Sequence, residues 1–266
     1  MSDFLLEQVA VAYPHCASYA LGPLDLIIRG GECLFISGPN GSGKTTLARA
    51  LTGVMPLAQG KIWRSDGLML DHWPAGTVAW LKQDPRQSTV GASVVEDIAW
   101  APFWQKSSVA VVQGIVEKAV QQFSLQDLRL RAPHTLSGGE WQRAALAAVS
   151  AQQAELVILD EADAMLDSLG REHLKFFVDH LRTTGCAVLL ISHHDVWESL
   201  ADRTLYLQEG KRTTKPEPAA AGESLRRWQE FIVQWKRMDP DAAGAERIAG
   251  QDVEKWLERL TSHRFS

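Results

Sequence analysis

The stretch Gly38-Pro39-Asn40-Gly41-Ser42-Gly43-Lys44-Thr45 decides the fold class of this 266-residue chain. It matches the pattern G-x-x-x-x-G-K-[S/T] and lies between an apolar segment, Cys33–Ser37, and a segment with helical character, Thr45–Leu51. A strand, a glycine-rich loop and a helix in that order aim several backbone N–H groups and the positive end of the helix at one point. The stretch therefore predicts a phosphate-binding loop, in which Lys44 bridges the β- and γ-phosphates and Thr45 offers its hydroxyl to Mg²⁺.

Two further apolar segments extend this unit into an α/β sheet. Leu156–Leu159 and Ala187–Ile191 are short and flanked by polar turn residues, which is typical of parallel strands buried on both faces. Apolar residues at helical spacing over Leu169–Leu181 predict the crossover helix that parallel strands need. The predicted fold class is α/β, with a mostly parallel nucleotide-binding core.

Two smaller regions accompany that core. Leu5–Tyr13 and Leu24–Ile28 predict a small antiparallel β region at the start of the chain. The stretch 94–151 is helix-prone and predicts an inserted helical subdomain, with Ile115, Ala119 and Phe123 along one stripe.

The last part of the chain has a different composition. A linker rich in Lys, Thr, Pro and Ala covers 211–222, and apolar residues then recur at helical spacing from Leu225 to Leu260, interrupted at Asp239-Pro240. We therefore expect a main nucleotide-binding domain at 1–215, followed at 216–266 by a linker and a helical C-terminal extension.

Composition narrows the class of protein. The chain is 45% hydrophobic and 22% charged, which is typical of a globular protein, and its apolar runs are far shorter than the roughly 18 residues that span a bilayer. A net charge of −5 gives no basic surface, so no nucleic-acid partner is expected. The start of the chain lacks a signal-peptide pattern, so we expect it in the cytoplasm. Cys16, Cys33 and Cys186 form no C-x-x-C pair and are expected to be buried thiols.

An acidic pair follows the expected strand Leu156–Leu159. Asp160 and Glu161 stand at its C-terminal end, where open α/β sheets bind ligands. We expect Asp160 to hold Mg²⁺ and Glu161 to act as general base on the water that attacks the γ-phosphate. A lone Asp-Glu pair is also common in solvated turns, and it is the phosphate-binding loop that favours the catalytic interpretation.

A second glycine-containing motif, Leu136-Ser137-Gly138-Gly139-Glu140, begins another helical segment at Trp141–Ala151. By itself it is equally compatible with a plain helix cap. Together with the phosphate-binding loop and the acidic pair it resembles the signature motif of ATP-binding-cassette ATPases, and the resemblance covers about residues 4–207. It implies ATP hydrolysis by two cassettes paired head to tail, in which Ser137 and Gly139 of one copy close over ATP on the loop of the other.

The same resemblance implies roles for single residues near these motifs. Tyr13 would stack on the adenine, with core packing or a surface aromatic as the alternatives and Tyr19 as the weaker candidate. Gln83 would sense the γ-phosphate and Mg²⁺. His193 would contact the γ-phosphate and help to hold Glu161.

The resemblance also covers further residues beside these motifs. His194 is interpreted as a bystander, and Asp167 as the acidic end of the loop that communicates between the cassettes, where Met165 departs from the usual small residue. The implied nucleotide-binding residues are Tyr13, Gly38, Pro39, Asn40, Gly41, Ser42, Gly43, Lys44, Thr45, Thr46, Ser137, Gly138, Gly139 and Glu140. The implied Mg²⁺ ligands are Thr45, Gln83 and Asp160, and the implied catalytic residues are Glu161, His193, Gln83 and Lys44.

The segment from Gln83 to Pro102 resembles energy-coupling-factor ATPases, which serve vitamin and transition-metal uptake. Ser88 stands where a second glutamine is usual. The resemblance implies a peripheral protein on the cytoplasmic face of the inner or plasma membrane, bound to a multi-spanning membrane partner. A groove around Val94, Ile98 and Trp100 would receive a coupling helix of that partner.

Several alternatives stay open at this point. The C-terminal helices are either a dimerisation element or a cap on their own domain, and the partner cassette is either the same chain or a related one. The chain could serve another class of cassette transporter, or work on DNA or ribosomes, although it lacks the long coiled coils or tandem cassettes usual there. A metabolic kinase would not need the motif at 136–140. The sequence does not identify the transported cargo, because another subunit selects it.

Overall fold

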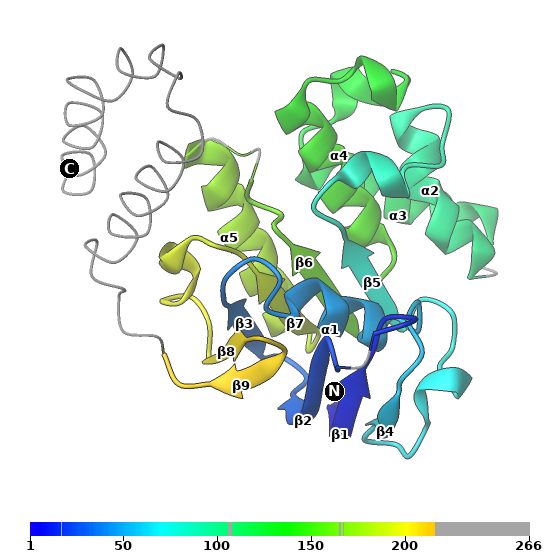
Figure 1. The fold of residues 1–266 in the computed structure, drawn as a ribbon. Helices are drawn as coiled ribbons and strands as arrows, with labels where there is room; N and C mark the ends of the chain where they lie inside the picture. Colours follow the sequence, from blue (N-terminus) through cyan, green and yellow to red (C-terminus); the bar gives the residue numbers. More distant parts are fainter. Residues whose placement is uncertain (17, 106–107, 165, 167, 216–266) are drawn as a thin grey trace, which may run out of the picture. The chain divides into compact units, whose positions relative to one another are not determined.

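The structure is a computed structural model in which residues 1–16, 18–105, 108–164, 166 and 168–215 are described. Met1–Thr214 form one compact unit (Figure 1). The linker expected at 211–222 begins instead with a short strand at Lys211–Thr213, while its remainder from 216 and the two-helix extension lie outside the described residues, so the domain organisation stays a prediction. No helix among the described residues is long and apolar enough to span a bilayer.

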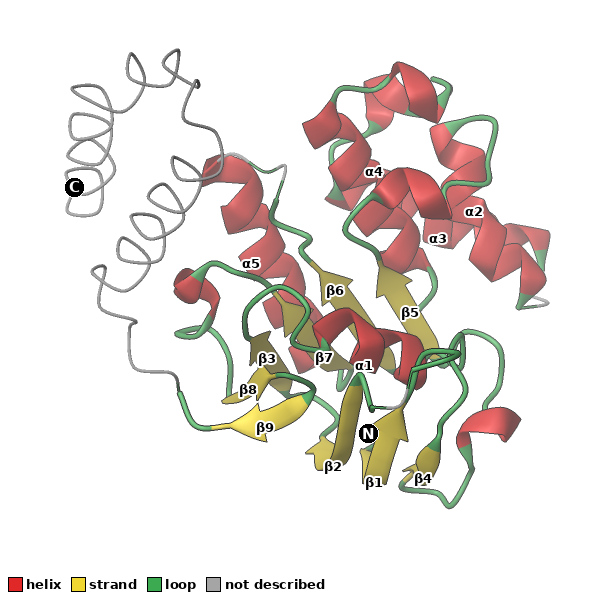
Figure 2. Cartoon of the chain, in the orientation of Figure 1, coloured by secondary structure: helices red, strands yellow, loops and turns green. Residues whose placement is uncertain are grey.

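A six-stranded sheet forms the centre of this unit, in the order β5-β6-β7-β3-β8-β9 (Figure 2). The strands are β3 (Cys33–Ser37), β5 (Val78–Leu81), β6 (Leu156–Asp160), β7 (Ala187–Ile191), β8 (Arg203–Gln208) and β9 (Lys211–Thr213). Neighbouring strands from β5 to β8 are parallel, and β9 runs antiparallel to β8. The predicted α/β class with a mostly parallel sheet is confirmed.

The second sheet is antiparallel, as predicted. It has three strands in the order β2-β1-β4, with β1 at Phe4–Val11, β2 at Leu21–Ile28 and β4 at Gln59–Arg64. The third strand, β4, was not predicted from the sequence, because its residues are mostly exposed or half-buried and show no apolar run.

Five α-helices are described, three of them between β5 and β6. They are α1 (Lys44–Leu51), α2 (Val94–Trp104), α3 (Val109–Gln122), α4 (Gly138–Ala151) and α5 (Ser168–Thr183), with short 3₁₀ turns at Leu70–His72, Pro85–Ser88, Gln126–Leu128, Pro133–Thr135 and Asp195–Trp197. The predicted inserted helical subdomain thus corresponds to α2, α3 and α4. Ala119 on α3 and Phe123, the residue that ends it, are buried, whereas Ile115 on the same predicted stripe is half-buried.

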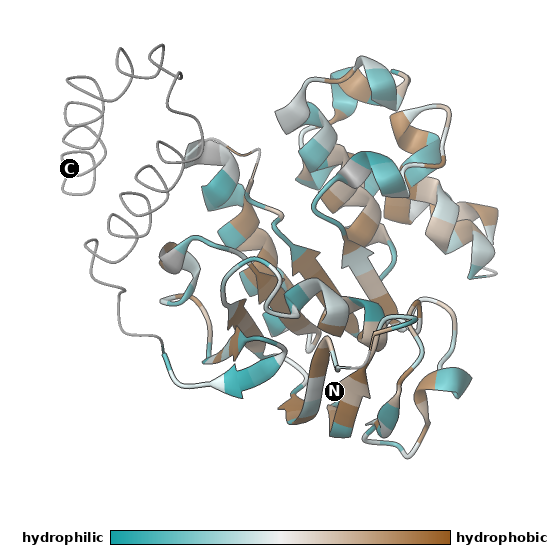
Figure 3. Cartoon of the chain, in the orientation of Figure 1, coloured by the Kyte–Doolittle hydropathy of each residue, from teal (hydrophilic) through white to brown (hydrophobic). Residues whose placement is uncertain are grey.

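Alternation along the central strands divides the core into two layers. On β6, Val157 and Leu159 face a cluster that includes α5, while Leu156 and Ile158 face a cluster that includes α1. This follows from the two-residue period of a strand, which sends successive side chains to opposite faces. Both faces are therefore covered, and β3, β6 and β7 are apolar apart from the final residues Ser37 and Asp160 (Figure 3).

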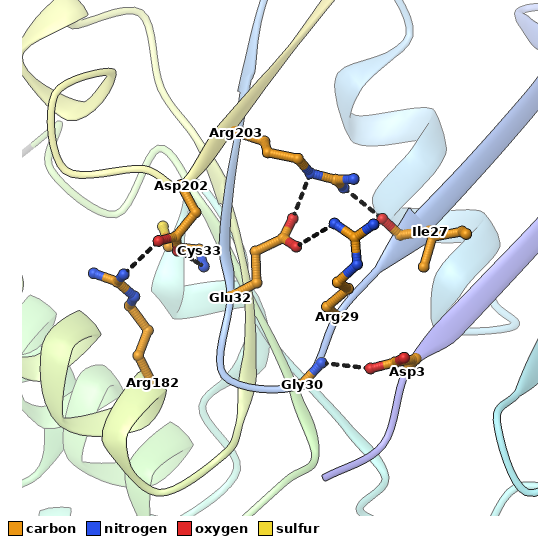
Figure 4. A network of polar contacts seen from close by, with 9 residues as sticks. All are labelled: Asp3, Ile27, Arg29, Gly30, Glu32, Cys33, Arg182, Asp202 and Arg203. Carbon is orange, nitrogen blue, oxygen red and sulfur yellow. Dashed lines mark hydrogen bonds and ion pairs between the residues drawn. The ribbon is translucent and has the colours of Figure 1, made fainter.

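A polar network joins the antiparallel sheet to the central sheet (Figure 4). The buried carboxylate of Glu32 accepts hydrogen bonds from Arg203 at 2.8 Å and from Arg29 at 3.4 Å, and Arg203 also donates to the carbonyl oxygen of Ile27 at 2.5 Å. Each charge has a partner, which offsets the cost of removing Glu32 from water. The network fixes the start of β3, the strand that leads into the phosphate-binding loop.

Candidate active site

Four neighbouring strands bring the predicted site residues together. Gln83 follows β5, Glu161 follows β6, His193 follows β7 and the phosphate-binding loop follows β3, and these strands are adjacent in the sheet. Because parallel strands end at one edge, motifs that are far apart in the sequence meet there.

The phosphate-binding loop is closed on itself by Lys44. Its ammonium nitrogen donates to the carbonyl oxygens of Gly38 at 2.8 Å and Pro39 at 3.0 Å. A Cβ at Gly38 would lie 2.2 Å from the carbonyl oxygen of Leu207, and one at Gly43 would lie 2.9 Å from that of Ala20, so both positions require glycine. The loop backbone therefore packs directly against the backbone at Leu207 and Ala20, where no side chain fits.

The electrostatics of the loop fit an anionic ligand. Burial lowers the pKa of the Lys44 ammonium, and the negative charges of Glu161 and Asp160 oppose that shift. Helix α1 has no acidic residue in its first turn to offset its positive end. The buried hydroxyl of Ser42 has no hydrogen-bond partner within the described residues. The Lys44 charge, the positive end of α1 and the unpaired Ser42 hydroxyl together suit phosphate oxygens.

Asp160 and Thr45 form a pair of oxygen ligands at the end of β6. The Thr45 hydroxyl donates to the Asp160 carboxylate at 3.2 Å, and Asp160 is 3% exposed. Burial raises the pKa of the Asp160 carboxyl, an effect that the Thr45 hydrogen bond and the charges of Lys44 and Arg49 reduce and that of Glu161 reinforces. A bound divalent cation would favour the charged carboxylate, and hydroxyl and carboxylate oxygens are ligands that Mg²⁺ accepts.

Glu161 is held from two sides. Gln83 donates from Nε2 to one carboxylate oxygen at 2.6 Å, and His193 Nε2 lies 2.9 Å from the other. The backbone of Glu161 has φ 51°, a conformation uncommon for a residue other than glycine, and its N–H donates to the carbonyl oxygen of Ile191 at 2.8 Å. The three residues predicted to act on the γ-phosphate and its attacking water thus come into direct contact.

Tyr13 lies beside the helix that follows the loop. Its hydroxyl is 3.3 Å from the Thr46 hydroxyl and accepts a hydrogen bond from Arg49 at 3.0 Å, and the residue is 38% exposed. The alternative of core packing is therefore not favoured. Tyr19 instead donates to Gln59 of β4 at 3.2 Å. Arg49 was missed by sequence reasoning, which had no signal to separate it from other helix-surface arginines.

The signature motif caps helix α4. Ser137 accepts from the backbone N–H of Glu140 at 3.4 Å, and the Glu140 carboxylate accepts from the backbone N–H of Ser137 at 2.8 Å, which together form a capping box. A Cβ at Gly139 would meet nothing within 4 Å. Among the described residues, no hydrogen bond or ion pair joins this motif to the phosphate-binding loop of the same chain.

A buried cluster behind Glu161 was also missed. Asp163, Ser192 and Trp197 are each buried, and Asp163 accepts hydrogen bonds from both of the other side chains. The available signal in the sequence was a tryptophan within the mostly polar stretch that follows β7. Met165 and Asp167, assigned to the communicating loop, lie outside the described residues.

The expected coupling groove needs correction. Val94 and Ile98 are each only 1% exposed, because they face the core shared by α2, α3 and α4. The exposed aromatic residues of α2 are Trp100, Phe103 and Trp104, at 49%, 61% and 62%.

The three cysteines were all predicted to be buried. Cys33 and Cys186 are buried, whereas Cys16 is exposed.

Comparison with known proteins identifies the class. The sequence model described as ABC transporter matches residues 21–164, so the chain belongs to the ATP-binding-cassette family and is an ATP hydrolase. It is similar to "Energy-coupling factor transporter ATP-binding protein EcfA1" of Latilactobacillus sakei, with 37% identity covering 78% of this chain and 75% of that protein. The protein of the same description from Lactiplantibacillus plantarum is 33% identical over 97% of this chain and 98% of its own length.

Solved structures agree on the fold. A structure titled as cbiO1 from Clostridium perfringens, part of the ABC transporter complex cbiONQ, has a TM-score of 0.69 at 22% identity, covering 92% of this chain and 98% of that one. A dimeric bacterial ABC transporter cassette has a TM-score of 0.70 at 21% identity, covering 79% and 97%.

Proposed function

We propose that this chain is the ATPase subunit of an energy-coupling-factor type transporter and drives import of a vitamin or a transition-metal ion. The main observation in support of ATP hydrolysis is that the Glu161 carboxylate is held between Gln83 and His193. The relatives named as energy-coupling-factor ATP-binding proteins support the transport part.

The residues around Glu161 suit hydrolysis of the γ-phosphate. Each carboxylate oxygen keeps a lone pair for a water molecule beyond its bond to Gln83 or His193. Glu161 takes a proton from that water as the water oxygen bonds to the γ-phosphorus, and the bond from the γ-phosphorus to the bridging oxygen breaks, so that ADP leaves with the electron pair.

The loop residues position the substrate for this step. Lys44 would exchange the carbonyl oxygens of Gly38 and Pro39 for β- and γ-phosphate oxygens. Thr45, Asp160 and Gln83 would hold Mg²⁺, which supplies neutralisation of the phosphate charge. Ser137 and Gly139 would act on ATP held by a second cassette, in a head-to-tail dimer.

Docking to a membrane partner is testable at the exposed aromatic group of α2, which consists of Trp100, Phe103 and Trp104. Phe103→Glu should abolish co-purification with the proposed multi-spanning membrane partner, because it places a carboxylate in an apolar contact. Phe176→Glu on α5 is the matched control, since Phe176 is similarly exposed at 70% and should tolerate the change. Equal binding by both variants would place the docking surface elsewhere.

The C-terminal segment is proposed to stabilise the ATPase dimer. A truncation after Lys215 should weaken dimerisation and leave docking to the membrane protein intact. Loss of docking with an unchanged dimer would instead make the segment part of the transport interface.

A further inference from the structure

A buried carboxylate lies two residues beyond the catalytic glutamate. The side chain of Asp163 is 1% exposed, in the turn that follows β6. Both of its oxygens accept from the Ser192 hydroxyl, at 3.0 and 2.9 Å, and Oδ2 also accepts from the Trp197 indole N–H at 2.5 Å. The two donors come from the segment after β7, so Asp163 joins two turns that are far apart in the sequence.

The segment after β7 carries His193 between these two anchors. Ser192 Oγ, besides donating to Asp163, accepts from the backbone N–H of His194 at 3.1 Å. Trp197 is 0% exposed and ends a short 3₁₀ turn. The His193 side chain itself is 41% exposed, and its one described polar partner is Glu161. Its position therefore depends on the residues that flank it.

The cost of burial makes these contacts mutually dependent. A buried carboxylate without donors is strongly destabilised, and a buried indole N–H without an acceptor also costs free energy. Asp163 and Trp197 satisfy each other, and the geometry holds only while the two turns keep their spacing. The turn is tied to α4 as well, since Gln142 donates to the carbonyl oxygen of Ala162 at 2.7 Å.

We propose that Asp163 and Trp197 are positioning residues for ATP hydrolysis, which hold the His193 loop against Glu161. The proposal rests on the role of Glu161 as general base. The indole–carboxylate bond sets the distance between the two turns, and the 2.9 Å approach of His193 to Glu161 depends on it. Neither Asp163 nor Trp197 contacts the substrate.

The first test is Trp197→Phe, which keeps the aromatic bulk and removes the indole donor. We expect kcat for ATP to fall by about tenfold with KM and ATP affinity unchanged within about twofold, because the phosphate-binding loop is untouched. Trp63→Phe is the matched control, since the indole nitrogen of Trp63 is buried without a hydrogen-bond partner among the described residues. A wild-type kcat for Trp197→Phe overturns the proposal.

A double-mutant cycle separates positioning from general destabilisation. In a His193→Ala background, Trp197→Phe should cause no further loss of single-turnover hydrolysis, since the residue that it positions is gone. An equal loss in both backgrounds overturns the proposal. Asp163→Asn, which keeps the shape and one acceptor, should reproduce a milder kcat defect even if Trp197→Phe folds poorly. Glu161→Gln is measured in parallel, because activity in that variant would instead remove the general base on which the proposal rests.

Discussion

His193 Nε2 lies 2.9 Å from a carboxylate oxygen of Glu161, although the two residues follow different strands and are separated by a helix and a strand in the sequence. The contact exists because β6 and β7 are parallel neighbours, with Asp160 paired to Ile191 at their ends. A water molecule bound at this point therefore meets the two side chains together.

Glu161→Gln should nearly abolish ATP turnover and leave ATP binding intact. The amide retains the size of the side chain and cannot take the proton, and loss of a general base typically costs about 10²- to 10⁴-fold. Steady-state phosphate release and binding of a fluorescent ATP analogue measure the two effects separately. Turnover near the wild-type rate would contradict the assignment.

Ser137→Arg should spare nucleotide binding by the monomer and prevent an ATP-dependent dimer. The larger side chain would fill the position where the γ-phosphate of the partner cassette docks. The substitution also removes the cap of α4, a loss of about 1 kcal/mol, so Ser137→Ala is the control that loses the cap without the bulk. Light scattering in a Glu161→Gln background gives the sizes. An arginine variant that dimerises as well as the alanine variant would argue against action in trans.

Asp160→Asn should stabilise the protein in the absence of nucleotide. Burial raises the pKa of Asp160, so the folded protein binds a proton there more tightly than the unfolded chain does. The resulting contribution to the free energy of unfolding is fully present below the ordinary carboxyl pKa and is lost as the pH rises through the raised pKa. At about pH 7 the substitution should therefore raise Tm.

The gain in Tm should shrink toward about pH 3, below the ordinary Asp pKa of about 3.9, where the carboxyl is mostly protonated in both states. Asp66→Asn is the control, and its change in Tm at about pH 7 should have the opposite sign, because the hydrogen bond with Arg64 lowers the pKa of that exposed carboxyl. Thermal melts of both variants at the two pH values test this. A gain for Asp160→Asn that is the same at both would contradict the explanation by burial.

Thiol reactivity should distinguish the three cysteines. Burial raises the pKa of Cys33 and of Cys186 to about 12, so neither forms the reactive thiolate at neutral pH. Cys16 is exposed. A disulfide exchange reagent should modify Cys16 rapidly in the native protein and the other two only after denaturation, and Cys16→Ser should abolish the rapid phase. Fast labelling of that variant would contradict the burial of the remaining thiols.

The sequence by itself determined the chemistry of the motifs. Gly38–Thr45 specifies a phosphate-binding loop because glycine and lysine at these spacings have few other uses between a strand and a helix, and the strand β7 could be delimited because its apolar run ends at polar residues. The Asp160-Glu161 pair acquired its meaning from that loop. Local pattern is sufficient where neighbouring residues determine both the conformation and the chemistry.

Tertiary structure decided the rest. The burial of Ile98 and the exposure of Phe103 depend on how α2 packs against α3 and α4, and one apolar helix does not reveal which of its faces meets a neighbour. The contact between Asp163 and Trp197 joins two turns through space, and neither turn has a local pattern that requires the other. Strand order decides which side chains meet across a sheet. It depends on the free energy of the whole fold and not on a local sequence pattern.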